Sequence, residues 1–134
     1  MSEENVEIVR RANAAFNSGD DAALVECFAA DAEIRDLANA PDQASVARGR
    51  DAIQEGRILW TDPFDEFRAE IEEYTDAGSA VVCAVRWHGR GKGSGVSIDL
   101  RQFDVYEVRQ GQIVRGILGF KSKSEALEAA GLSE

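Results

Sequence analysis

The sequence predicts a single α+β domain in which helices come first and antiparallel strands follow. Apolar residues recur at helical spacing in the N-terminal half, alternating strand patterns dominate residues 67–120, and glycine-containing turns separate these patterns. Helices followed by a run of strands are typical of α+β domains. The chain has 134 residues, 44% of them hydrophobic, so we expect one core and one domain over residues 1–134.

Helices are expected before the strands. The first begins near Ser2, and its inward stripe consists of Val6, Val9, Asn13 and Phe16. A second short helix is expected to begin at Asp20 or Asp21 and to run into Phe28, after which the chain turns at Asp31. A third helix is expected over residues 51–60.

Four strands and a last helix are expected in the second half of the chain. Alternation and turn residues place the strands at 67–74, 80–88, 96–108 and 112–120. The last helix is expected over residues 124–130, ending at Gly131, a residue type that commonly terminates helices.

Side-chain alternation divides these strands into an inner and an outer face. We expect the inner face, covered by the helices, to mix apolar and polar side chains: Val82, Ala84, Arg86, His88, Gln102, Asp104, Tyr106, Leu118 and Phe120. Burying so many polar groups costs free energy unless they pair or meet water. A cavity open to solvent resolves this cost, so we predict a small-molecule pocket whose wall also includes Trp60.

The outer face is expected to be apolar as well, through Val85, Trp87, Phe103, Val105 and Ile117. The helices can cover only one face of the sheet, and monomers rarely expose a large contiguous apolar patch. We therefore predict a homodimer through the outer sheet face.

The charge and composition of the chain exclude some kinds of partner and indicate its cellular location. The net charge of −10 repels phosphate backbones, so nucleic acid is not expected as a partner. The sequence has no run of about 18 apolar residues, so no membrane span is expected. The acidic start, Met1 to Glu4, lacks the basic and apolar parts of a signal peptide, which predicts a cytoplasmic protein. Cys27 and Cys83 lie far apart among apolar residues and are interpreted as buried free thiols.

The sequence contains no motif for a metal or a cofactor, and we expect neither. His88 is the only histidine, so no cluster of histidines can form. The glycine-rich residues 89–95 lack the Lys-Ser or Lys-Thr pair of a phosphate loop and are interpreted as a hairpin. No Ser-His-Asp order, cysteine pair or dinucleotide fingerprint is present.

Residues 28–36, Phe-Ala-Ala-Asp-Ala-Glu-Ile-Arg-Asp, carry a resemblance to a known family. They follow Phe-Asn-Ser-Gly-Asp at 16–20 and precede Gly-Arg-Asp-Ala-Ile at 49–53. This order resembles the N-terminal half of the NTF2-like cone fold, in its SnoaL-like and ketosteroid-isomerase-like branch, and the resemblance continues to Phe120. It implies three N-terminal helices packed on a strongly curved antiparallel sheet that encloses a pocket, with Asp36 at its mouth.

The resemblance also implies roles for two acids. Asp36 lies where ketosteroid isomerases have their general base, and Asp104 where they have a protonated aspartic acid that donates to the enolate oxygen. Two departures matter: Ala12 replaces the tyrosine that donates to the oxyanion, and Arg86 and His88 replace aromatic walls. Steroid isomerisation is therefore not expected, and the polar wall better suits relatives that cyclise polyketides or hydrolyse epoxides.

The leading hypothesis is a small-molecule-binding protein that works as a cofactor-independent isomerase, cyclase or hydrolase. Asp36 would be the base, and Asp104 with His88 or Arg86 would stabilise the oxyanion. The alternatives are a non-catalytic ligand carrier or sensor, and a module that only dimerises. Asp104 could instead form a structural salt bridge, and Tyr106 is either an oxyanion donor or a core tyrosine.

Overall fold

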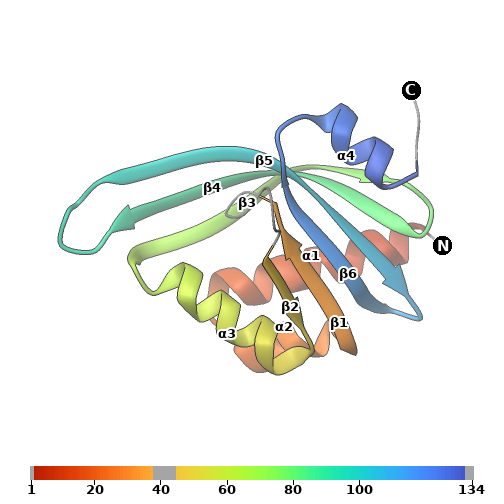
Figure 1. Cartoon of the computed structure of the whole chain (residues 1–134), viewed down its shortest axis with the longest axis horizontal. Helices are drawn as coiled ribbons and strands as arrows, with labels where there is room; N and C mark the ends of the chain where they lie inside the picture. The colour runs from red at the N-terminus through yellow and green to blue at the C-terminus, as the bar shows by residue number, and fades with distance from the viewer. Residues whose placement is uncertain (1, 38–44, 132–134) are drawn as a thin grey trace.

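The computed structural model describes residues 2–37 and 45–131 (Figure 1). The described part has the α+β architecture that we predicted, with helices packed on one mixed sheet. In chain order the elements are α1 (Ser2–Ser18), α2 (Asp21–Glu26), β1 (Phe28–Asp36), β2 (Ser45–Arg48), α3 (Arg50–Thr61), β3 (Phe64–Asp76), β4 (Ala80–Gly91), β5 (Ser97–Arg109), β6 (Gln112–Phe120) and α4 (Lys123–Ala129).

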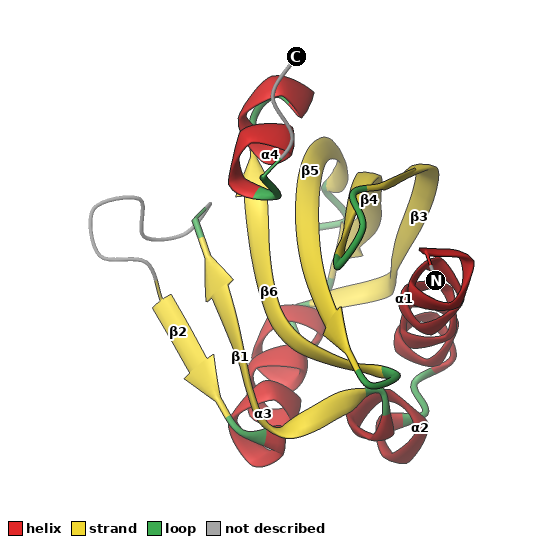
Figure 2. Ribbon diagram, turned by 90° about the vertical axis from the view of Figure 1, so that its right-hand side faces the viewer, coloured by secondary structure: helices red, strands yellow, loops and turns green. Residues whose placement is uncertain are grey.

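The described strands form a six-stranded sheet in the order β2-β1-β6-β5-β4-β3. The sheet is strongly curved and open, and α1, α2 and α3 lie on its concave side (Figure 2). Neighbouring strands pair antiparallel except for β1 and β6, which run parallel. Within the described part, no helix is long and apolar enough to cross a membrane.

The strands β1 and β2 differ from our expectation of a turn at Asp31. Helix α2 ends at Glu26, and the chain then continues as an extended strand through Asp31 to Asp36. The acidic sequence of β1 has few β-branched residues, so its strand propensity is weak. Pairing with β6 on one side and β2 on the other overrides that propensity, as tertiary context often does in sheets.

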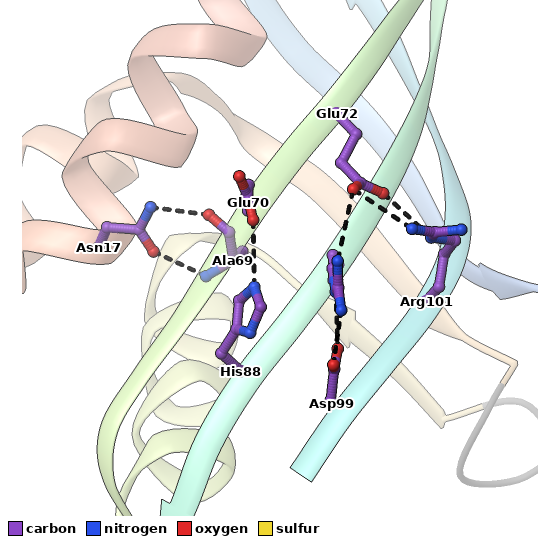
Figure 3. A network of polar contacts seen from close by, with 8 residues as sticks. Asn17, Ala69, Glu70, Glu72, His88, Asp99 and Arg101 are labelled. Atoms are coloured by element: carbon purple, nitrogen blue, oxygen red, sulfur yellow. Dashed lines mark hydrogen bonds and ion pairs between the residues drawn. The ribbon is translucent and has the colours of Figure 1, made fainter.

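A two-way hydrogen bond attaches α1 to β3. The side-chain amide of Asn17 donates to the carbonyl of Ala69 and accepts from its N–H, both at 2.8 Å (Figure 3). This contact sits where β3 is irregular, because the pairing with β4 shifts register between Asp65 and Arg68. Ala69 is paired with Trp87 of β4 just beyond this shift, and β3 is an edge strand, so Asn17 attaches the helix to the edge of the sheet.

The register between β4 and β5 corrects our assignment of faces on β4. Cys83 lies opposite Asp104, Val85 opposite Gln102, and Trp87 opposite Leu100, and directly opposed residues share a face. The inner residues of β4 are therefore Val81, Cys83, Val85 and Trp87, and the outer residues are Val82, Ala84, Arg86 and His88. Both sets begin with small apolar side chains, so alternation alone could not distinguish them, and a shift of one residue exchanges the faces.

Helix α4 covers the centre of the outer face, where it packs Ala126 and Leu127 against Val82 and Val105. Phe120 also packs in this outer cluster. Because Val85 and Trp87 face inward, the outer face carries less exposed apolar surface than we expected. The thiols of Cys27 and Cys83 are buried and free, as predicted.

Candidate functional site

A cavity of about 240 Å³ lies between the helices and the concave face of the sheet. Apolar side chains from both layers make up most of its wall, among them Val9, Phe16, Ile34, Val85, Trp87 and Leu118. Polar side chains enter it from the sheet and from the helices: Asn13, Asp36, Arg57, Gln102, Asp104 and Tyr106. This composition is typical of a small-molecule site.

Two carboxyl groups lie on either side of strand β6 at the cavity wall. Asp36 of β1 and Asp104 of β5 both pair with Leu118 of β6, one on each side. Adjacent strands lie about 4.8 Å apart, so the two backbones are about 10 Å apart and the side chains share one face. The sheet therefore brings together two acids that are 68 residues apart in the sequence.

Asp104 is the buried acid of this pair, with 1% of its surface exposed. Its Oδ1 accepts hydrogen bonds from Gln102 Nε2 and from the N–H of Gly119, both at 3.0 Å. Its Oδ2 is buried and has no hydrogen-bond partner among the described residues. Burial raises the pKa of Asp104 to about 7, the two hydrogen bonds oppose this rise, and the charge of Asp36 adds to it.

Asp36 is the more accessible acid, at the end of β1. We expected it to lie at the mouth beside the segment from Leu37 to Ala47, of which residues 38–44 lie outside the described part. Asp36 lines the cavity, and its charge contributes to the raised pKa of Asp104. The two carboxyl groups thus occupy different environments, which is how paired acids acquire different protonation states.

Tyr106 lines the same cavity, and burial raises the pKa of its phenol. The ring of Tyr106 lies against the backbone of β6 at Gly116. A Cβ atom on residue 116 would lie 3.2 Å from this ring and 2.7 Å from Ile34 Cδ1. The glycine therefore makes room for Tyr106 against the sheet. Ala12, at the position of the absent tyrosine, lines the cavity as well.

Arg86 and His88 lie on the outer face of the sheet, and the two acids lie on the inner face. Arg86 donates from Nε and Nη2 to the two carboxylate oxygens of Asp99, each at 2.7 Å. His88 Nε2 lies 3.1 Å from Glu70 Oε1. The arginine lowers the pKa of Asp99, and neither Arg86 nor His88 pairs with Asp104. The structural salt bridge that we considered for Asp104 is not formed.

Of the predicted site residues, the structure brings five together at the cavity: Asp36, Gln102, Asp104, Tyr106 and Leu118. The structure places Val82, Ala84, Arg86, His88 and Phe120 on the opposite face. Phe120 is turned outward because the pairing shifts between Phe103 and Asp104, where Gly119 adopts a positive φ of 98°. The side chain of Trp60 lies outside the described part.

Arg57 is a cavity residue that we did not predict. Its Nη2 lies 2.5 Å from Asp21 Oδ1, and its guanidinium carbon lies 6.0 Å from the centre of the Phe16 ring. Helical spacing could have indicated it, because Arg57 follows the apolar Ile53 by four residues and so shares its inward face. Trp87 was missed for a different reason, the exchanged faces of β4.

A wider and more open hollow of about 910 Å³ lies at the far end of the sheet, beside Asn17, Arg68, His88 and Asp99. Asn17, His88 and Asp99 already have protein partners. The smaller cavity instead contains a buried carboxyl oxygen without one, so we regard it as the candidate site. Among the described residues, no group of three or more histidine, cysteine or acidic side chains is placed to hold a metal ion.

Comparison with solved structures supports the fold. Bal32a, from a soil-derived mobile gene cassette, is 26% identical with a TM-score of 0.78, over 96% of each chain. A protein of ketosteroid isomerase-like fold from Catenulispora acidiphila DSM 44928, crystallised with trimethylamine, is 23% identical with a TM-score of 0.76, over 94% of this chain and 93% of that one. SalBIII, an epoxide hydrolase/cyclase-like enzyme of salinomycin pyran ring formation, is 23% identical with a TM-score of 0.74, over 90% and 92%.

Comparison with curated proteins found no match. The profile of the SnoaL-like domain, in contrast, matches residues 9–116, a span that begins within α1, ends within β6 and contains both cavity acids. This match agrees with the helices on a curved six-stranded sheet, with the cavity between them, and with the structural neighbours. The chain belongs to the SnoaL-like domain family, within the NTF2-like superfamily.

Proposed function

We propose that the cavity binds a small, mostly apolar organic molecule and that Asp36 and Asp104 carry out acid–base chemistry on it without a cofactor. The observation that carries this proposal is Asp104, a buried carboxyl with a pKa of about 7 and one oxygen without a protein partner, in an apolar cavity shared with a second acid. Perturbed acids of this kind are more common in functional sites than elsewhere.

The two environments suggest a division of roles. Asp36, ionised, accepts a proton from a carbon next to a carbonyl group of the ligand, and the electron pair moves onto the carbonyl oxygen. Asp104 in its protonated form donates a hydrogen bond from Oδ2 to that oxygen, since its Oδ1 is already engaged by Gln102 and Gly119. Asp36 then returns the proton to a carbon. Isomerisation and ring closure both use such steps, whereas in a hydrolysis Asp36 would instead accept the proton of an attacking water molecule.

His88 has no part in this proposal, because it lies on the outer face with Glu70. The absence of a cation beside Asp104 matters more. We expected that a close Arg86 would hold Asp104 as a carboxylate and that without one it would be protonated and able to donate. Arg86 is paired with Asp99 on the other face and does not lower the pKa of Asp104, so the protonated form is available near neutral pH.

The proposal is tested by a ligand screen using thermal shift, followed by turnover of the best ligands. Asp36→Asn should abolish turnover and leave binding nearly intact, because the amide keeps the shape and loses the proton acceptor. Asp104→Asn should reduce turnover more mildly, because the amide can still donate. Asp31→Asn, an exposed acid on the same strand as Asp36, is the matched control and should change neither. An unchanged turnover in Asp36→Asn would exclude this acid as the base.

A ligand carrier or sensor is the second candidate function, favoured by the mainly apolar lining of the cavity. The neighbour crystallised with trimethylamine supports binding of small molecules, and the epoxide hydrolase/cyclase-like neighbour supports catalysis. Ligands that bind in the thermal-shift screen but are never converted would favour a carrier or sensor.

We also propose a homodimer through the outer face of β2, β1 and β6. Val46, Arg35 and Ile117 form one row across these strands, and Val46 is 38% exposed. A cytoplasmic location is likewise a proposal, which fractionation of the source cells would test.

A further inference from the structure

Arg57 places a fixed guanidinium in the wall of an otherwise acidic and apolar cavity. It comes from α3, on the side of the cavity opposite the sheet, and keeps 15% of its side chain exposed. The ion pair with Asp21 and the ring of Phe16 hold it in position. Its Nε is buried and donates to no described residue, although arginine has five N–H donors to satisfy. An oxygen acceptor on a ligand would remove this deficit.

The contacts of Arg57 link it to the part of the cavity wall around Trp87, which is distant from Asp104 along the sheet. The ring of Phe16, over which it sits, contacts Trp87 with 5.5 Å between ring centres. Trp87 pairs with Leu100, and Leu100 is four residues before Asp104 on β5. At about 3.3 Å per residue, the row of Trp87 is about 13 Å along the strand from Asp104. A ligand that reaches both ends is therefore elongated, with an apolar body along Val85 and Trp87.

The charges around Arg57 select the kind of acceptor. Asp21 already neutralises the guanidinium, Asp36 adds negative charge to the same cavity, and the whole chain carries a net charge of −10. A carboxylate ligand would meet this repulsion and would also lose its hydration. A neutral carbonyl oxygen accepts the same hydrogen bond without either cost.

We propose that Arg57 is a specificity-determining residue that binds a neutral carbonyl oxygen, of a ketone, ester or amide, on an elongated apolar ligand. This oxygen is remote from the atoms that Asp36 and Asp104 act on, so it orients the ligand and takes no part in the proton transfer. The inference rests on the proposed binding of small molecules in this cavity and adds a chemical class to it.

The experiment compares two probes of nearly equal shape by isothermal titration calorimetry: 4-phenylbutan-2-one, a neutral ketone, and 3-phenylpropanoate, in which a carboxylate oxygen replaces the methyl group. The unmodified protein should bind the ketone about tenfold more tightly or better than the acid. Arg57→Met keeps an apolar stem and removes the donors, so it should weaken ketone binding about tenfold, the value of one hydrogen bond to a charged group. Arg48→Met, which removes an exposed arginine paired with Glu33 outside the cavity, is the control and should leave both affinities unchanged.

The outcomes separate this inference from the proposed function. Equal or tighter binding of the acid, or ketone binding that does not depend on Arg57, would overturn the inference while ligand binding stands. Failure of both probes to bind the unmodified protein would remove the binding proposal and this inference with it. If Arg57→Met does not fold, Arg57→Lys keeps the charge and the pair with Asp21 but lacks the planar fork, and it should still weaken ketone binding, by about threefold. Unchanged ketone affinity in Arg57→Lys would also overturn the inference.

Discussion

At the scale of single residues, the chemistry of the protein depends on the balance around Asp104. Removal from water disfavours its carboxylate form, and two hydrogen bonds to Oδ1 only partly restore it. The result is an acid that changes charge near neutral pH although a free aspartate does so near pH 3.8. A carboxyl group of this kind can act as a hydrogen-bond donor at pH 7, which an ordinary aspartate cannot.

This balance predicts a pH dependence of stability. Between about pH 4 and pH 7 the unfolded chain releases the Asp104 proton and the folded chain keeps it, so the contribution of this group to stability falls as the pH rises. The loss levels off above the folded pKa and amounts to about 4 kcal/mol. Urea unfolding at pH 5 and pH 8 should therefore show a larger loss for the unmodified protein than for Asp104→Asn. Parallel pH profiles for the two proteins would contradict the raised pKa.

At the scale of elements, Asn17 attaches α1 to β3 and so helps to set the position of this helix beside the cavity. Asn17→Ala removes both hydrogen bonds to Ala69 and leaves the N–H and C=O of a buried residue without partners. We expect this change to lower the free energy of unfolding by about 2 kcal/mol. Asn5→Ala, which removes an exposed bond from the same helix to Gly78, is the control and should cost clearly less. Urea titration of both variants measures the difference.

The elements also show what the sequence could and could not predict. Helix caps and turn residues placed α1, α3, α4 and the β3–β6 meander within a few residues. The inner face of β5 was predictable because Gln102, Asp104 and Tyr106 contrast with their neighbours. The faces of β4 were not, because Val81 and Val82 begin two equally apolar rows. β1 was missed because its strand is made by pairing with β6 rather than by its own composition.

The candidate site followed the same pattern. Alternation was enough to bring Asp104, Tyr106 and Leu118 to one wall, and the family resemblance pointed to Asp36. Phe120 was assigned to the wrong face because a bulge leaves no clear mark in a sequence that has glycines at both 116 and 119. Arg57 was not predicted, because a charged residue on a helix normally indicates the solvent side.

At the scale of the whole molecule, part of the outer face of the sheet extends beyond helix α4. Helix α4 covers its centre, and the row of Val46, Arg35 and Ile117 lies beyond it on β2, β1 and β6. If this row is a dimer interface, Val46→Glu should place a charge at the contact and give monomers. Sedimentation at micromolar concentration would test this, with Val96→Glu, on the exposed residue before β5, as the control. A monomeric unmodified protein would reject the homodimer.

Gly119 affects the structure on both faces of the sheet. Its N–H holds Asp104 in the cavity, and the backbone turn that it makes sends Phe120 to the cluster under α4. The docking of the C-terminal helix and the position of the acid are therefore set by the same peptide unit. A displacement of α4 that moves Phe120 would therefore also move the N–H group that donates to Asp104, although α4 and the acid lie on opposite faces.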